Sequence, residues 1–103
     1  MARIETAFTP DLIFQAVEEE TGVNLDMIKA CNRKREIVTA RKIAATLLYT
    51  LTGFTLETVG TMINRDHASV LYYRKTLLGH IDTEDATVEL VWRIVERLNI
   101  EIK

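Results

Sequence analysis

The stretch NRDHASVLYYRK, at residues 64–75, places an acid directly before a histidine and then continues into an apolar, aromatic and basic pattern. A carboxylate beside an imidazole can act in acid–base catalysis or bind a metal ion. Such a site also needs a nucleophile or a metal partner, and adjacent residues at a helix start point about 100° apart. We therefore interpret Asp66 and His67 as contacts to a partner, and we predict neither an enzyme nor a cofactor or metal site.

A helical period in residues 66–81 separates a buried face from an exposed one. Leu77 and Ile81 fall within about 20° of Val70, whereas the opposite half carries small and polar residues. Such a helix start fits a major groove about 12 Å wide, where first-turn side chains meet base edges. The candidate major-groove residues are Arg65, Asp66, His67, Ala68, Ser69 and Tyr72, followed by Lys75 as a candidate phosphate contact.

The residues before this helix have the spacing of a helix-turn-helix. Two short helices that cross near a right angle need a small residue where their backbones approach, and Gly60 occupies that place. Asn64 follows as the turn, because asparagine tolerates a positive φ, and Asp66 is placed to cap the second helix. The spacing indicates a helix-turn-helix, although small helical proteins that do not bind DNA can share it.

The charge of the chain is unevenly distributed. The net charge of −2 and the pI of 5.7 are unusual for a nucleic-acid-binding domain. However, residues 31–80 carry a net charge of +5, between flanking regions of −4 and −3. Such a local positive field can attract a polyanion. Two interpretations of the basic segment are open, a DNA-binding segment or a solvated helix face. Its five cations lie within ten residues: Arg33, Lys34, Arg35, Arg41 and Lys42.

The sequence pattern predicts helices along the whole chain. It has 103 residues, of which 48% are apolar, enough for one compact domain with a buried core. Apolar residues recur at spacings of three and four throughout. We predict an all-α fold of five or six helices, with residues 1–103 as a single domain. The expected helices cover about residues 10–20, 24–30, 36–51, 55–63, 66–81 and 85–98.

Two of these helices carry expectations about individual side chains. In the helix over 36–51, an apolar stripe faces the core, and we expect Arg41 and Lys42 to project from the other side. In the last helix, we expect a stripe of core residues formed by Val88, Val91, Trp92, Val95 and Leu98. Cys31 is the only cysteine, and no stretch is apolar enough to span a membrane. We therefore expect a cytoplasmic, nucleoid-associated protein with no membrane partner.

The blocks RKREIVTARKIAATLLYTLTGFTLETVGTMI and NRDHASVLYYRK resemble the C-terminal DNA-binding domain of the bacterial replication initiator DnaA, whose signature has the form RDHTTV. The resemblance covers about residues 10–98. Arg-Asp-His at 65–67, followed by Ser-Val-Leu at 69–71, is the specific part of the match. The resemblance implies a Trp-repressor-like helical fold that contains a helix-turn-helix.

The resemblance also implies a role for each matching residue. Segment 66–69 would read bases in the major groove, with Arg65 beside it at the phosphates. Arg33 would enter the adjacent minor groove. Phosphate contacts are implied for the remaining cations, Lys34, Arg35, Arg41 and Lys42. These contacts would supply most of the affinity, and the groove residues most of the discrimination.

The sequence departs from the family pattern in three places. Ala68 stands where the signature has threonine, which leaves a methyl group that can touch a thymine methyl. The turn is one residue shorter than the common Gly-Gly form, with Asn64 alone before Arg65. No GxxxxGK[ST] loop is present, so an origin-melting role is not implied.

Two hypotheses for the function follow. The first is sequence-specific binding of double-stranded DNA with a DnaA-box-like preference, linked to replication initiation or its regulation. The alternative is a DnaA-like interaction module that binds a replication protein with little DNA affinity, in keeping with the acidic total. A separate ATPase chain would be a further partner. Strong salt dependence of DNA binding favours the first hypothesis over the second.

Overall fold

The computed structural model describes residues 9–83 and 85–101, which form six helices and no strand. The helices are α1 (Pro10–Thr21), α2 (Leu25–Lys29), α3 (Arg35–Thr52), α4 (Leu56–Ile63), α5 (His67–Thr83) and α6 (Asp85–Glu101). The predicted all-α class is confirmed, and α5 and α6 run slightly longer than expected. Within the described ranges, no helix has the length and apolar character needed to cross a membrane.

Polar side chains set where several helices begin. Thr9 precedes Pro10, and its hydroxyl accepts a backbone N–H of the first turn of α1 at 3.2 Å. Asn24 caps α2, and Thr55 caps α4, in the same way. Gly22 follows the last residue of α1, and its φ of +77° is one that residues with a side chain rarely adopt. Threonine and asparagine are typical of helix starts, and glycine of helix ends.

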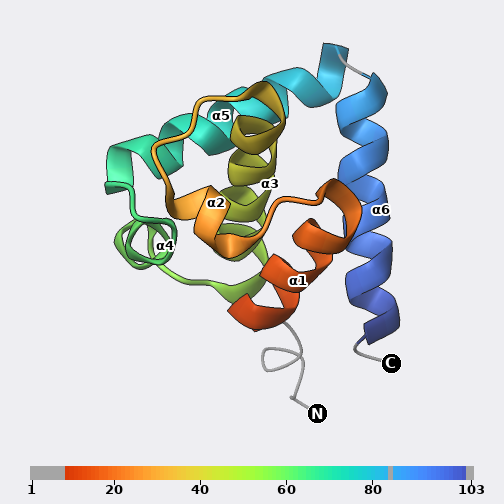
Figure 1. Ribbon diagram of the computed structural model, residues 1–103, viewed down its shortest axis with the longest axis horizontal. Helices are drawn as coiled ribbons and strands as arrows, with labels where there is room; N and C mark the ends of the chain where they lie inside the picture. The colour runs from red at the N-terminus through yellow and green to blue at the C-terminus, as the bar shows by residue number, and fades with distance from the viewer. Residues whose placement is uncertain (1–8, 84, 102–103) are drawn as a thin grey trace.

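α3 is the central helix and contacts α1, α2, α4 and α5 (Figure 1). The apolar stripe predicted for this helix lies in the core, except that Leu51 is only partly buried. Its other residues are Ile37, Ala40, Ala44, Leu47 and Leu48. Val70 and Leu77 of α5 join this core, as predicted. The side chain of Ile81, expected beside them, lies outside the described residues. The buried side of α5 therefore holds the helix against α3 and leaves its other side outward.

α6 contacts α1 and α5 and runs along one side of the molecule (Figure 1). An ion pair fastens it to α1, because Arg97 Nη2 lies 2.6 Å from Glu20 Oε2 and Arg97 Nη1 lies 3.0 Å from Glu19 Oε1. Hydrogen bonding to Glu20 raises the pKa of Arg97. The pair therefore holds the last turn of α1 against α6. The start of α1 and the end of α6 lie at the lower edge of Figure 1.

The expected core stripe of α6 was right at Leu98, but its centre was wrong by about a quarter turn. Trp92 is 62% exposed, whereas the residues at 0% exposure are Ile94 and Leu98. Val88, Val91 and Val95 are only half-buried, and together with Trp92 they line a surface hollow of about 140 Å³. The helix carries two neighbouring apolar stripes, and α1 and α5 cover the one centred on Ile94.

Candidate nucleic-acid interface

α4, the turn at residues 64–66 and α5 form the predicted helix-turn-helix. Asn64 adopts the left-handed conformation, with φ 61° and ψ 46°. The next residue, Arg65, donates its backbone N–H to the Gly60 carbonyl at 2.8 Å. A Cβ atom at Gly60 would overlap the carbonyl of Arg65 and press on the backbone of Asp66. The close approach of α4 to the turn therefore requires glycine at this position, as the sequence indicated.

Asp66 begins α5 as its N-terminal cap. Its Oδ1 accepts the backbone N–H of Ser69 at 2.8 Å, and its carbonyl accepts the N–H of Val70 at 3.3 Å. The hydrogen bond from Ser69 lowers the pKa of Asp66, so the carboxylate is ionised at neutral pH and can only accept hydrogen bonds. An anion at this end is also favoured by the helix dipole. The carboxylate thus holds the first turn of α5 in place.

The outward side of α5 carries most of the predicted major-groove residues. Val70 is 0% exposed, which directs the residues on the opposite side to solvent. Of the predicted contacts that lie on α5 itself, Ser69 is half-buried and four are exposed: His67, Ala68, Tyr72 and Lys75. Asp66, the cap before the helix, is exposed as well. Leu71 and Leu78, which the sequence reasoning passed over, are each 48% exposed on the same helix. The start of α5 is therefore free to meet a partner.

The basic loop, residues 30–34, joins α2 to α3. Arg33 and Lys34 are exposed within it, and Arg35 is exposed at the start of α3. Asn32 stabilises the loop, because its Oδ1 accepts the backbone N–H of Lys34 at 2.9 Å. Three exposed cations thus follow one another in a segment whose backbone is locally held.

Arg41 does not project outward, so this expectation was wrong. The residue is 3% exposed, and its guanidinium donates to the backbone of α2 and the basic loop. Its Nε lies 2.8 Å from the Ile28 carbonyl, and its Nη2 lies 3.0 Å from the Ala30 carbonyl and 3.1 Å from the Asn32 carbonyl. Burial lowers the pKa of Arg41, and the nearby charge of Arg65 acts in the same direction. Lys42, the next residue, is half-buried.

The reason for this error lies in the helical period itself. Arg41 follows Ile37 by four residues and precedes Ala44 by three, which places it on the buried side of α3 at about 40° from Ile37. A long side chain at such a position must reach a polar partner within the protein. The carbonyls at the end of α2 provide those partners.

Arg65 also binds the end of α2 rather than extending freely into solvent. Its Nη2 lies 2.7 Å from the Ala30 carbonyl, and its Nη1 lies 3.3 Å from the Lys29 carbonyl. Asn64 adds a bond from Nδ2 to the Lys29 carbonyl at 3.3 Å. The helix-turn-helix turn therefore lies directly against the segment that leads into the basic loop.

One hollow of about 440 Å³ connects the two parts of the predicted surface. Its lining combines residues of the basic loop, α3, the turn and α5, among them Arg33, Arg41, Arg65 and Tyr73. The basic loop and the helix-turn-helix turn thus share one side of the molecule. Arg33, exposed beside this hollow, and the start of α5 can meet a single extended ligand at the same time.

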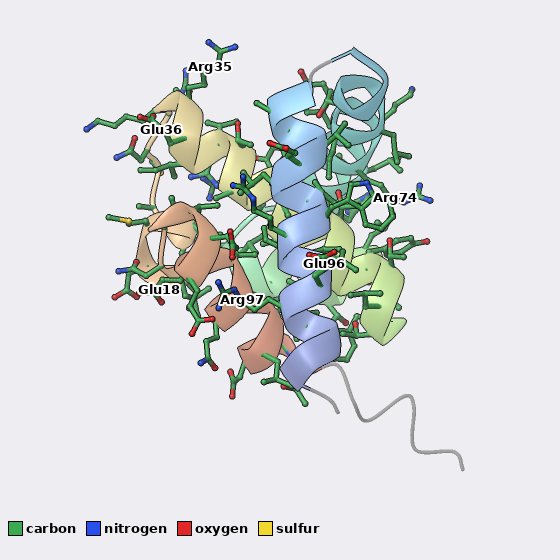
Figure 2. All side chains as sticks on the ribbon, turned by 90° about the vertical axis from the view of Figure 1, so that its right-hand side faces the viewer. Glu18, Arg35, Glu36, Arg74, Glu96 and Arg97 are labelled. Carbon is green, nitrogen blue, oxygen red and sulfur yellow. The ribbon has the colours of Figure 1, made fainter. Side chains whose placement is uncertain are left out.

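α5 carries one more cation, Arg74, which the sequence reasoning did not single out. Its guanidinium carbon lies 5.2 Å from the centre of the Tyr49 ring in α3, a cation–π arrangement. Figure 2 shows Arg74 on the opposite side of the molecule from Arg35. Arg74 is therefore remote from the start of α3, where the basic loop ends.

Comparison with known proteins identifies the fold family. Residues 10–76 match the family model described as the bacterial DnaA protein helix-turn-helix. The chain belongs to this DnaA helix-turn-helix family. The matched range contains the turn, the capped start of α5 and the basic loop, so the family resemblance predicted from the Arg-Asp-His stretch is confirmed.

Individual relatives agree with this assignment. The chain is 36% identical over 92 residues to a chromosomal replication initiator protein DnaA of a Picosynechococcus species. The aligned region covers 87% of this chain and 20% of the relative. It is 37% identical over 79 residues to the DnaA protein of Bacteroides thetaiotaomicron, covering 76% of this chain and 17% of the relative. The chain thus spans about one fifth of the length of these DnaA relatives.

Proposed function

We propose that the chain forms a single domain that binds double-stranded DNA sequence-specifically, in connection with replication initiation or its regulation. The observation that carries this proposal is the shared surface, in which the exposed Arg33 and the turn that leads into the exposed start of α5 line one hollow. α5 enters the major groove, and Arg33 enters the adjacent minor groove. Family membership supports the same function, because the relatives are named as chromosomal replication initiators.

The side chains at the start of α5 suit base reading. His67 can exchange hydrogen bonds with base edges, the Ala68 methyl suits a thymine methyl, and Ser69 can donate or accept. Asp66, already ionised and engaged with the backbone of α5, can accept from a cytosine amino group. Tyr72, 60% exposed one turn further along, reaches the sugar or phosphate at the edge of the groove.

The cations that reach solvent supply the phosphate contacts. Exposed or half-exposed candidates surround the start of α5 and the basic loop, namely Lys34, Arg35, Lys42 and Lys75. Arg41 is not among them, because its donors are used within the protein. About four phosphate contacts predict that log affinity falls against log salt concentration with a slope of about −4.

Salt titration tests this proposal directly. A duplex selected by the protein from a random pool should lose about 10²-fold in affinity between 50 and 200 mM salt. Lys42→Ala should reduce the slope by about 1 and weaken binding to all duplexes to a similar extent. A salt-independent affinity, or no binding at low salt, would contradict DNA binding as the function.

His67→Ala tests base reading. The side chain is exposed, so its loss should leave the thermal stability nearly unchanged. Binding to the selected duplex should weaken by about 1–3 kcal/mol, while binding to random-sequence DNA should change little. Fluorescence anisotropy with both duplexes measures the difference. Equal losses on the two duplexes would show that His67 does not discriminate bases.

One observation supports the second candidate, a module that binds another replication protein. Trp92 is 62% exposed beside three half-buried valines of α6, on a chain whose net charge is −2. Exposed aromatic side chains are common at protein interfaces. A protein with this function would bind DNA negligibly at every salt concentration. The same salt titration therefore separates the two candidates.

A further inference from the structure

Two arginines from separate elements meet at the C-terminal end of α2. The last carbonyls of a helix have no partner within the helix, and cationic donors nearby stabilise them. Here Arg41 of α3 and Arg65 of the turn supply those donors. Both guanidiniums bind the Ala30 carbonyl, Arg41 through Nη2 at 3.0 Å and Arg65 through Nη2 at 2.7 Å.

The two arginines differ in what holds them. Arg41 is buried in α3, so its position is set by the core. Arg65 immediately precedes the cap of α5, and its backbone N–H is bonded to Gly60 at 2.8 Å. The backbone of Arg65 therefore moves with the start of α5, while its guanidinium is bonded to Ala30, the first residue of the basic loop.

The distance from this contact to the minor-groove residue is short. Arg33 follows Ala30 by three residues, so its Cα can lie no further than about 11 Å from the Ala30 Cα. Asn32, between them, is held from two sides, because its carbonyl accepts from Arg41 and its Oδ1 accepts from Lys34. Little freedom remains for Arg33 once Ala30 and Asn32 are fixed.

We propose that Arg65 is a positioning residue, whose guanidinium sets the location of Arg33 relative to α5 by holding the Lys29 and Ala30 carbonyls. The inference rests on the proposed function, because it concerns how the two groove-binding parts are kept in register. Arg65 acts on minor-groove binding through the backbone of the basic loop. Loss of its side chain leaves the loop attached to α3 through Arg41 but removes the tie of the Arg65 side chain between the loop and the turn before α5, and so reduces the contribution of Arg33 to affinity.

A double-mutant cycle on the selected duplex measures this coupling. Arg33→Ala should weaken binding about tenfold in the wild-type background and about threefold or less in the Arg65→Ala background. Arg74→Ala is the charge-matched control, because it removes one cation on the opposite side of the molecule from the start of α3 (Figure 2). In that background, Arg33→Ala should keep its tenfold effect. Equal effects of Arg33→Ala in all three backgrounds would overturn the proposal.

The free protein offers a second measurement that does not depend on DNA. Cys31 is the only cysteine of the chain and is exposed next to Ala30, so a nitroxide attached to it reports on the mobility of the basic loop. The label should become more mobile in Arg65→Ala, and in the milder variant Arg65→Gln if alanine impairs folding, while Arg74→Ala should leave it unchanged. Unchanged mobility in both Arg65 variants would overturn the proposal.

The two experiments also separate failure of the inference from failure of the proposed function. If the wild-type protein binds no duplex at low salt, the proposed function fails, whatever the label reports. If the wild-type protein binds its selected duplex but the cycle is additive, the DNA-binding function stands and the positioning role of Arg65 fails.

Discussion

Arg41→Ala is expected to lower the free energy of unfolding by about 3 kcal/mol, because it removes a buried guanidinium and its donors to the Ile28 and Asn32 carbonyls, and leaves the Ala30 carbonyl with Arg65 alone. Three bonds, to Ile28, Ala30 and Asn32, are lost together. Arg41→Lys should recover little of this loss, since a compact ammonium cannot reproduce the planar fork that reaches several carbonyls at once. Urea denaturation followed by far-ultraviolet circular dichroism measures both changes.

Lys42→Ala is the matched control for this prediction. It removes one positive charge from the neighbouring position of α3, where the side chain is half-buried. Its effect on the free energy of unfolding should stay within about 0.5 kcal/mol. If Arg41→Ala left stability unchanged and weakened binding to every duplex alike, Arg41 would be a phosphate contact after all.

Gly60→Ala is expected to destabilise the fold by about 2 kcal/mol. Alanine is intrinsically better than glycine within a helix by about 1 kcal/mol, but here its methyl group would overlap the carbonyl of Arg65. Relief requires α4 to move away from the turn, which stretches the 2.8 Å bond from the Arg65 N–H to the Gly60 carbonyl. Thermal and urea unfolding both report the loss, and affinity for the selected duplex should fall with it.

Gly79→Ala provides the opposite expectation within the same protein. Gly79 lies inside α5, and a Cβ atom there would meet nothing within 4 Å. Alanine at this position should raise the free energy of unfolding by up to about 1 kcal/mol. If Gly60→Ala also stabilised the protein, the close approach of α4 to the turn would not constrain the fold.

The helix-turn-helix was predictable because its determinants are local. The left-handed turn at Asn64 and the close contact at Gly60 depend on residue types that tolerate few substitutes. The cap at Asp66 depends on a bond to Ser69, three residues away. Val70 and Leu77, seven residues apart, define the buried side of α5 and hence the outward side. Each of these features is determined by residues that lie close to it in the sequence.

Errors arose where a neighbouring element decides which side of a helix is covered. Trp92 belongs to an apolar stripe that satisfies a helical period as well as the buried stripe at Ile94 and Leu98 does. Only the positions of α1 and α5 choose between the two stripes. For Arg41, the helical period places the residue on the buried side of α3, whereas its positive charge alone favours an exposed position.

The role of Arg65 was beyond sequence reasoning for a different reason. Its partners at Lys29 and Ala30 lie 36 and 35 residues earlier in the chain. The residue types do not indicate which backbone carbonyl accepts such a bond, since every residue carries one. Contacts of this kind appear only when the helices are packed in three dimensions.

The placement of the start of α1 and the end of α6 has a practical consequence for attaching other modules. Both lie at the lower edge of Figure 1, while the basic loop and the start of α5 lie at its upper left. A fluorescent reporter or a surface tether joined beyond the start of α1 or the end of α6 would therefore leave the side that we propose to bind DNA unobstructed.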